Sequence, residues 1–168
     1  MIMHVLVRLL ADGTLVLLAG VAAYALVWRI PQGQRFEAYG RIIMAGLTAY
    51  LAAKLIASVY QPAQERPFEL LGKAAGALYL QNAGFPSDHA LFAMFLTLAV
   101  WFETKSRKLT VVMAVLTVLM GIGRVLALVH TPLDIIGGFV IACVGALWYA
   151  QRNPVKLPHR PLVKKAKS

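Results

Sequence analysis

Charge and cysteine are both scarce in this chain of 168 residues. Only 14% of the residues are Asp, Glu, Lys or Arg, and just seven of them are acids. Water-soluble domains carry about 25% charged residues, so this composition excludes most soluble folds. Cys143 is the single cysteine and lies within an apolar run, which excludes an internal disulfide framework. Internal repeats, coiled-coil heptads and low-complexity tracts are also lacking.

Apolar residues, by contrast, make up 60% of the chain, and the mean hydropathy is +0.69. A chain this apolar exposes much hydrophobic surface and therefore requires a lipid bilayer around it. A helix needs about 20 residues to cross the hydrocarbon, so five or six spans consume nearly all of the length. We therefore predict an all-α integral membrane protein: a bundle of five, or at most six, transmembrane helices that forms one domain over residues 1–150.

Five apolar stretches of helical length support this prediction. They cover residues 5–28, 42–60, 90–101 with its flanks, 109–128 and 133–149. The first stretch carries Arg8 and Asp12 four residues apart, where the two side chains can pair on one helix face. A cleaved signal peptide is the alternative for this stretch, but the apolar run continues to Trp28. In the long connection 61–85, apolar residues at helical spacing over 68–80 predict a short interfacial helix.

Positive charge is concentrated in three segments, 29–41, 103–108 and 151–168. Together they hold 12 of the 17 basic residues and two of the seven acids, and the rest of the chain is neutral. With five spans these segments share one side of the membrane, which the positive-inside rule makes cytoplasmic. The tryptophans Trp28, Trp101 and Trp148 then fall at the cytoplasmic ends of their spans. The net charge of +10 is thus a topology signal and not a nucleic-acid site, and 151–168 is predicted to be a disordered cytoplasmic tail.

Polar residues gather on the opposite, extracytoplasmic side, where ionisable groups are costly and usually functional. The candidates are Arg66, Ser87, Asp88, His89, Arg124, His130 and Asp134. They supply what a phosphate ester site requires. Arginine binds phosphate oxygens bidentately, one imidazole can attack phosphorus, and a second can protonate the leaving oxygen. A carboxylate fixes the tautomer of the attacking imidazole.

Local patterns bring these residues to one depth. Ser87 is a plausible N-cap of the third span, while Thr131 and Asp134 have the spacing of a capping box at the start of the fifth. Arg124 lies near the outer end of the fourth span. Each residue also has a purely structural interpretation, with Ser87 and Asp134 as caps and His89 as a packed core histidine. The coincidence of all of them on one side favours the catalytic interpretation.

Three elements resemble the signature motifs of the type 2 phosphatidic acid phosphatase superfamily, whose members are membrane-embedded, metal-independent lipid phosphatases. The elements are Arg66-Pro67, Pro86-Ser87-Asp88-His89 and Arg124-x5-His130-x3-Asp134. The resemblance covers about residues 54–138. It implies that His130 is the nucleophile that forms a phosphohistidine, that Asp134 orients it, and that His89 is the general acid. It also implies that Arg66, Arg124 and Ser87 hold the phosphoryl oxygens, without metal or cofactor.

The chain departs from the family pattern at two positions. Asp88 replaces the usual Gly of the second motif. The resulting sequence Pro-Ser-Asp-His is similar to that of the family branch that includes bacitracin-resistance-type undecaprenyl-diphosphatases. Because a carboxylate beside a phosphate is unfavourable, we expect Asp88 to cap the helix or to pair with a lysine or arginine. Gly123 replaces the Ser that usually precedes the arginine of the third motif, and backbone amides can donate in place of that hydroxyl.

The first motif has unusual spacing. The family places a lysine before the Arg-Pro pair with six residues between them, whereas eleven separate Lys54 from Arg66. The alternative register Lys54-x6-Gln61-Pro62 has the family spacing but lacks the arginine. Lys54 either extends toward the phosphate site or pairs with a carboxylate, and Lys73 is a third candidate.

These inferences predict an undecaprenyl-diphosphate phosphatase of the bacterial inner membrane, with an extracytoplasmic active site and a role in cell wall synthesis and bacitracin resistance. Its expected partners are a polyprenyl or glycerolipid phosphate and membrane lipids. A phosphatidylglycerophosphate or phosphatidic acid phosphatase and a lipid phosphotransferase remain open. From a different class, a small transporter or structural membrane protein is the alternative, although transporters place ionisable groups near the bilayer midplane.

Overall fold

The computed structural model describes residues 2–63, 65–82 and 84–150, and this described part contains helices and loops but no strand. The predicted tail 151–168 lies outside the described residues. The elements in chain order are α1 (Ile2–Arg8), the π-helical turn η1 (Leu9–Gly13), α2 (Thr14–Trp28), the 3-10 turn η2 (Gln32–Gln34), α3 (Arg35–Val59), α4 (Pro67–Leu70), α5 (Asp88–Thr104), α6 (Arg107–Leu126), α7 (Pro132–Ala142), the 3-10 turn η3 (Cys143–Ala146) and α8 (Leu147–Ala150).

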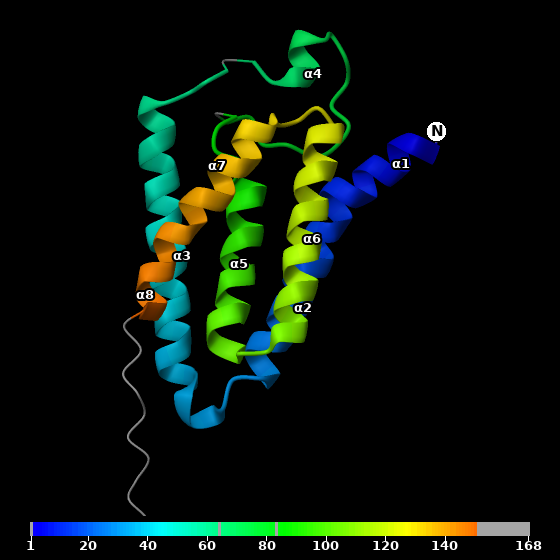
Figure 1. Ribbon diagram of the computed structural model, residues 1–168. Helices are drawn as coiled ribbons and strands as arrows, with labels where there is room; N and C mark the ends of the chain where they lie inside the picture. The colour runs from blue at the N-terminus through cyan, green and yellow to red at the C-terminus, as the bar shows by residue number, and fades with distance from the viewer. Residues whose placement is uncertain (1, 64, 83, 151–168) are drawn as a thin grey trace, which may run out of the picture.

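Four helical stretches of the described chain are long and apolar enough to cross a membrane: Ile2–Trp28, Gln32–Val59, Arg107–Leu126 and Pro132–Ala150. They confirm the predicted all-α membrane fold. The remaining expected span is α5, which has 17 residues and is therefore about 25 Å long. It stands at the centre of the bundle and packs against α2, α3, α6 and α7 (Figure 1).

Small residues let these helices approach closely, as is usual where helices pack in lipid. Ala45, Ala49 and Ala53 of α3 and Ala90 and Ala93 of α5 are all buried. Glycines make the tightest contacts. A Cβ added to Gly138 of α7 would lie 2.8 Å from both Ala90 Cβ and the Ser87 carbonyl oxygen, and one added to Gly145 would lie 2.4 Å from the Ala45 carbonyl oxygen. The start of α5 is thus pressed against α7.

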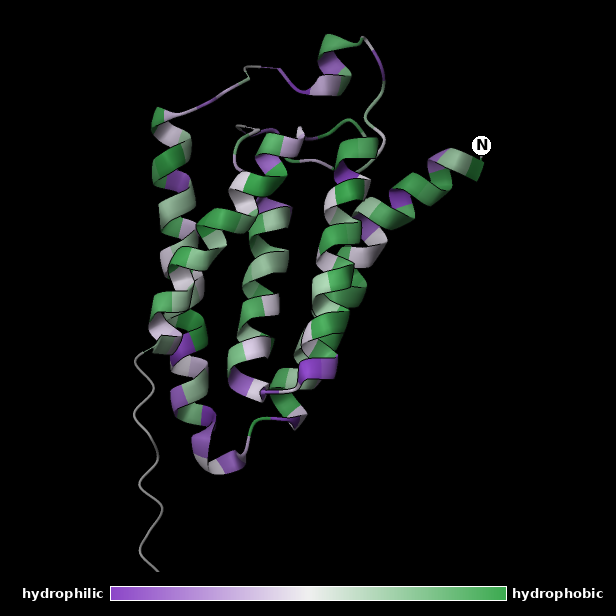
Figure 2. Ribbon diagram, in the orientation of Figure 1, coloured by the Kyte–Doolittle hydropathy of each residue, from purple (hydrophilic) through white to green (hydrophobic). Residues whose placement is uncertain are grey.

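The two ends of the bundle differ in character. The connections that follow α2 and α5 carry basic residues and lie at one end, and the connections that follow α3 and α6 lie at the other (Figure 1). Hydrophilic residues gather at both ends, and hydrophobic ones cover most of the length between them (Figure 2). At the basic end, Arg41 of α3 donates to both carboxylate oxygens of the buried Glu103 of α5, at 2.8 and 2.9 Å.

One expectation needs correction. The helix expected over 68–80 is confined to the single turn α4, because the chain turns at Gly72, where φ is +60°, and then runs beside the end of α6. Gly76 N–H donates to the Ala127 carbonyl oxygen there at 3.0 Å. Trp148 lies in α8, in the last turn of its helical stretch. Its indole N–H donates to Thr48 Oγ1 of α3 at 2.8 Å.

The contact at Gly138 gives a test of the packing. Gly138→Ala places a methyl group against Ser87 and Ala90, and such overpacking typically costs about 1–3 kcal/mol. We expect a lower midpoint of thermal unfolding in detergent. Gly20→Ala is the control, since nothing lies within 4 Å of its added Cβ. Equal midpoints for the two variants would contradict the close α5–α7 contact.

Candidate active site

His130 lies in the connection between α6 and α7 and is buried. Its Nδ1 is 3.5 Å from Oδ2 of Asp134 in the first turn of α7. The same Oδ2 accepts a hydrogen bond from Thr131 N–H at 2.7 Å, and Thr131 Oγ1 accepts one from Asp134 N–H at 3.2 Å. The predicted capping box is therefore present. Because it holds the carboxylate beside Nδ1, it leaves Nε2 as the ring nitrogen that faces away from Asp134.

Ser87 and His89 mark the start of α5. Ser87 is fully buried and is the predicted N-cap, with its Oγ accepting from Ala90 N–H at 3.4 Å. Its own N–H donates to the Asp134 carbonyl oxygen at 3.0 Å, which ties the start of α5 to the start of α7. His89 is partly buried in the first turn and interacts electrostatically with Arg124 and His130.

Arg124 lies in the last turn of α6 and is fully buried. Its Nη1 donates to Asp12 Oδ1 at 3.0 Å and to the Leu78 carbonyl oxygen at 2.6 Å. The other oxygen of Asp12 accepts from Leu78 N–H at 3.1 Å. Nε of Arg124 is buried and has no hydrogen-bond partner among the described residues. The guanidinium is thus held from one side and keeps an N–H free on the other.

Sequence reasoning missed Asp12, which it paired with Arg8. That pair is long, at 3.9 Å, and Arg8 is largely exposed. The π-helical turn η1 instead aims Asp12 at Arg124. Gly123 permits this approach, since an added Cβ would lie 2.6 Å from both the Ala11 nitrogen and the Leu10 carbonyl carbon. A serine there would collide with the backbone of η1. The one sequence feature that could have pointed to Asp12 is its position as a lone carboxylate within an apolar span.

Arg66 lies beside the His130 segment, at the N-terminus of α4. Its Nη1 donates to the Val129 carbonyl oxygen at 2.7 Å, its Nη2 donates to the carbonyl oxygens of Leu80 and Asn82, and the guanidinium stacks on Tyr79 at 5.3 Å. These contacts hold the loop between α4 and α5 against the start of the α6–α7 connection.

Gln61, the alternative from the first motif, occupies a different place. Its amide donates to the Phe85 carbonyl oxygen at 2.9 Å and accepts from Phe85 N–H at 3.4 Å. Lys73, the third cation considered, is exposed in the turn after α4. The structure therefore places Arg66 beside His130, and it places neither Gln61 nor Lys73 there.

Lys54 and Asp88 form an ion pair between α3 and α5. Lys54 Nζ lies 2.9 Å from Asp88 Oδ1 and 3.3 Å from Oδ2, which confirms the expectation that Asp88 pairs with a basic residue. Asn82 Nδ2 donates to Asp88 Oδ2 at 2.7 Å, and Asn82 Oδ1 accepts from Arg66 Nη2 at 3.1 Å. Asn82, which the sequence did not single out, thus links the two cations.

The electrostatic setting favours the neutral form of His130. Burial lowers the pKa of His130 below the usual 6.5, and the charges of Arg124 and Arg66 lower it further, while Asp134 opposes both effects. No three His, Cys, Asp or Glu side chains in the described part of the chain gather closely enough to hold a metal ion. A neutral imidazole oriented by a carboxylate, beside two guanidinium groups and a second histidine, suits transfer of a phosphoryl group to a ring nitrogen.

An all-helical membrane bundle with these groups at one end has the parts of a phosphoryl-transfer enzyme. Residues 38–156, more than two thirds of the chain, match the PAP2 superfamily. The chain therefore belongs to this superfamily, whose members are phosphatases, and this supports hydrolysis of phosphate esters. No match was found among curated proteins or among solved structures.

The Asp12–Arg124 pair gives a second test. Asp12→Ala leaves a buried guanidinium without its carboxylate, a change that costs about 3–5 kcal/mol. We expect a lower midpoint of thermal unfolding and a loss of phosphatase activity. Asp12→Asn should lie between this variant and the wild type, because it retains an oxygen acceptor. Glu37→Ala is the control, since the Glu37 side chain is 77% exposed and pairs with Arg41 at the basic end. If Asp12→Ala resembles Glu37→Ala, the pair does not hold Arg124.

Proposed function

We propose that this protein removes the terminal phosphate of undecaprenyl diphosphate and so returns undecaprenyl phosphate to cell wall synthesis. The observation that supports this most is the buried His130–Asp134 pair beside Arg124 and Arg66, at one end of an apolar bundle. Family membership supports a phosphorylated, lipid-type substrate. Asp88, the feature similar to the bacitracin-resistance branch, favours a diphosphate over a glycerolipid monoester.

The charge distribution supports an extracytoplasmic site in a bacterial inner membrane. Arg29 and Lys105 lie in the connections at the end opposite His130, and Arg107 begins α6 there. The positive-inside rule assigns that end to the cytoplasm. A long polyprenyl chain can then stay in the outer leaflet while its diphosphate headgroup reaches the site from the side.

In the first proposed step, Nε2 of His130 attacks the terminal phosphorus in line with the bridging oxygen. The bond from phosphorus to that oxygen breaks, and His89 in its protonated form gives the oxygen a proton. Undecaprenyl phosphate leaves, and His130 carries the phosphoryl group. Asp134, whose Oδ2 lies 3.5 Å from Nδ1, balances the positive charge that develops on the ring.

In the second step, neutral His89 takes a proton from a water molecule whose oxygen attacks the phosphohistidine. The phosphorus–nitrogen bond breaks, inorganic phosphate leaves, and His89 is again protonated, so that one water is consumed per turnover. The unpartnered Nε–H of Arg124 and the Ser87 hydroxyl are the proposed donors to the phosphoryl oxygens. Such fixed donors are usually the largest contribution to catalysis.

Substitution of the nucleophile tests the mechanism. His130→Ala should lower phosphate release from undecaprenyl diphosphate by at least about a thousandfold, and wild type quenched during turnover should carry acid-labile phosphate on His130. His4→Ala is the control, because His4 is exposed near the N-terminus. Equal activity of the two variants would reject the nucleophile. Faster hydrolysis of phosphatidylglycerophosphate or phosphatidic acid than of undecaprenyl diphosphate by the wild type would reject the substrate.

The pH profile tests the setting of His130. The attacking ring must be neutral, so kcat/KM should fall as the pH drops through a His130 pKa that lies below 6.5 because of burial. In Asp134→Asn the influence that raises this pKa is lost, so the acid limb should shift to still lower pH while kcat decreases. The ionisation of the substrate is common to both proteins and cancels in the comparison. Superimposable acid limbs would show that Asp134 does not act on His130.

A further inference from the structure

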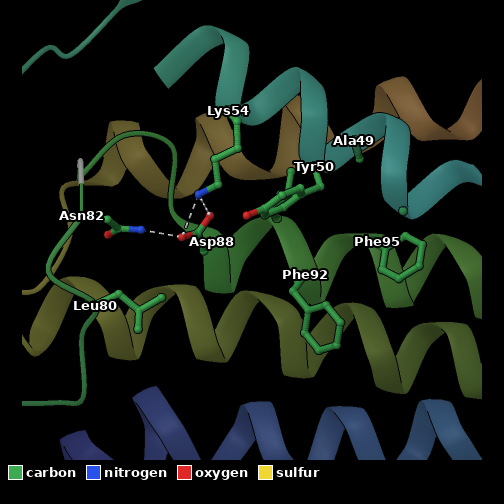
Figure 3. Close-up of a pocket in the computed structure, with 10 residues that line it drawn as sticks. Ala49, Tyr50, Lys54, Leu80, Asn82, Asp88, Phe92 and Phe95 are labelled. Carbon is green, nitrogen blue, oxygen red and sulfur yellow. Dashed lines mark hydrogen bonds and ion pairs between the residues drawn. The ribbon is translucent and has the colours of Figure 1, made fainter. Parts of the chain in front are cut away.

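A pocket of about 530 Å³ lies between α3 and α5 (Figure 3). One end is polar and is formed by Lys54, Asp88 and Asn82. The rest of the wall is apolar, with Tyr50, Phe92 and Phe95 as its largest side chains. This division of polar and apolar groups matches a ligand with a charged head and a hydrocarbon chain.

The polar end presents a lysine that is only partly used. Lys54 Nζ has three N–H donors. Its hydrogen bonds both go to Asp88, and the ammonium group also lies 5.1 Å from the centroid of the Tyr50 ring. The Lys54 side chain is 41% exposed, so at least one donor can reach a ligand. Asp88 is itself held by Asn82 and therefore fixes the ammonium group in place. A cation within a membrane helix is costly, and it usually marks a functional site.

The polar end adjoins the proposed site of phosphoryl transfer. Asp88 directly precedes His89, the proposed general acid, and Asn82 contacts both Asp88 and Arg66. Toward its other end the pocket opens on the lipid-facing surface, where Tyr50 is 51% exposed and Phe92 is 45% exposed. A ligand in this pocket can therefore place its head next to His89 and its chain toward the hydrocarbon.

We propose that this pocket, the retained-phosphate subsite, binds the phosphate that stays on the lipid together with the first part of the lipid chain. Lys54 donates to that phosphate while the terminal phosphate lies at His130, so Lys54 determines the preference for diphosphates over monophosphates. The inference rests on the proposed function and adds how its substrate is recognised. It also gives a role to the long interval between Lys54 and Arg66, because the two cations serve different phosphates.

The test compares kcat/KM for farnesyl diphosphate and farnesyl phosphate, two substrates that share a chain, in one detergent. In Lys54→Met the diphosphate-to-monophosphate ratio should fall about ten- to a hundredfold, as expected for one lost hydrogen bond to a charged group. Lys54→Arg should keep the ratio within about threefold of wild type, because it retains the charge. Lys108→Met, which alters an exposed lysine at the basic end, should leave the ratio unchanged.

The outcomes separate the two proposals. A purely structural role of Lys54 would slow both substrates equally, and an unchanged ratio in Lys54→Met would reject the subsite while the proposed function stands. If wild type releases phosphate from glycerolipid monoesters but not from prenyl diphosphates, the proposed function fails and the subsite fails with it. Should Lys54→Met not fold, a reduced ratio in Lys54→Gln has the same meaning, and an unchanged one rejects the subsite.

The apolar wall has its own test. In Phe92→Ala, kcat/KM for farnesyl diphosphate relative to the five-carbon dimethylallyl diphosphate should fall about tenfold, because the longer chain loses a contact that the shorter one reaches less. Leu47→Ala removes a side chain of α3 that is 52% exposed and does not line the pocket, so this ratio should stay at the wild-type value. Equal ratios in the two variants would show that the prenyl chain of the substrate does not bind against Phe92 in this pocket.

Discussion

A fully buried guanidinium, that of Arg124, is the constraint on which the proposed active end of this molecule depends. A cation removed from water at the end of an apolar helix must be compensated by charge and hydrogen bonds. Asp12 supplies the charge, and the Leu78 carbonyl oxygen supplies a further acceptor. Each partner comes from a different part of the chain, so satisfying Arg124 brings together the first helix, the α4–α5 loop and α6. The absence of a side chain at Gly123 is part of the same arrangement.

Charge pairs between elements recur through the bundle. Lys54–Asp88 joins α3 to α5 near the proposed site, and Arg41–Glu103 joins the same two helices at the basic end. Between these pairs, buried alanines and glycines let the apolar helices approach closely. Because every cation near the proposed site has a partner that positions it, a phosphate would meet groups that are already oriented. This is the preorganisation on which phosphoryl transfer relies.

Sequence patterns predicted the parts of the proposed site that depend on neighbouring residues, but not the contacts between distant parts of the chain. The caps at Ser87 and Thr131 were predictable because capping is set by residue type and short spacing, and the structure contains both. Asp12 and Asn82 were not identified. Asp12 acts across 112 positions of sequence and Asn82 acts from an irregular loop, and neither belongs to a motif. The helix predicted over 68–80 was too long because hydrophobic periodicity alone does not reveal the turn at Gly72.

The sequence by itself determined that the protein lies in a membrane, that its fold is all-helical, and at which end of the bundle the polar residues lie. These properties follow from apolar length, local capping and the placement of basic residues, all of which can be read along the chain. Only the tertiary structure decided which partner each charged group takes: Asp12 for Arg124, Asp88 for Lys54, and backbone carbonyl oxygens for Arg66. In a low-dielectric interior each buried charge is compensated by whatever packing brings nearest, and packing is a property of the folded chain as a whole.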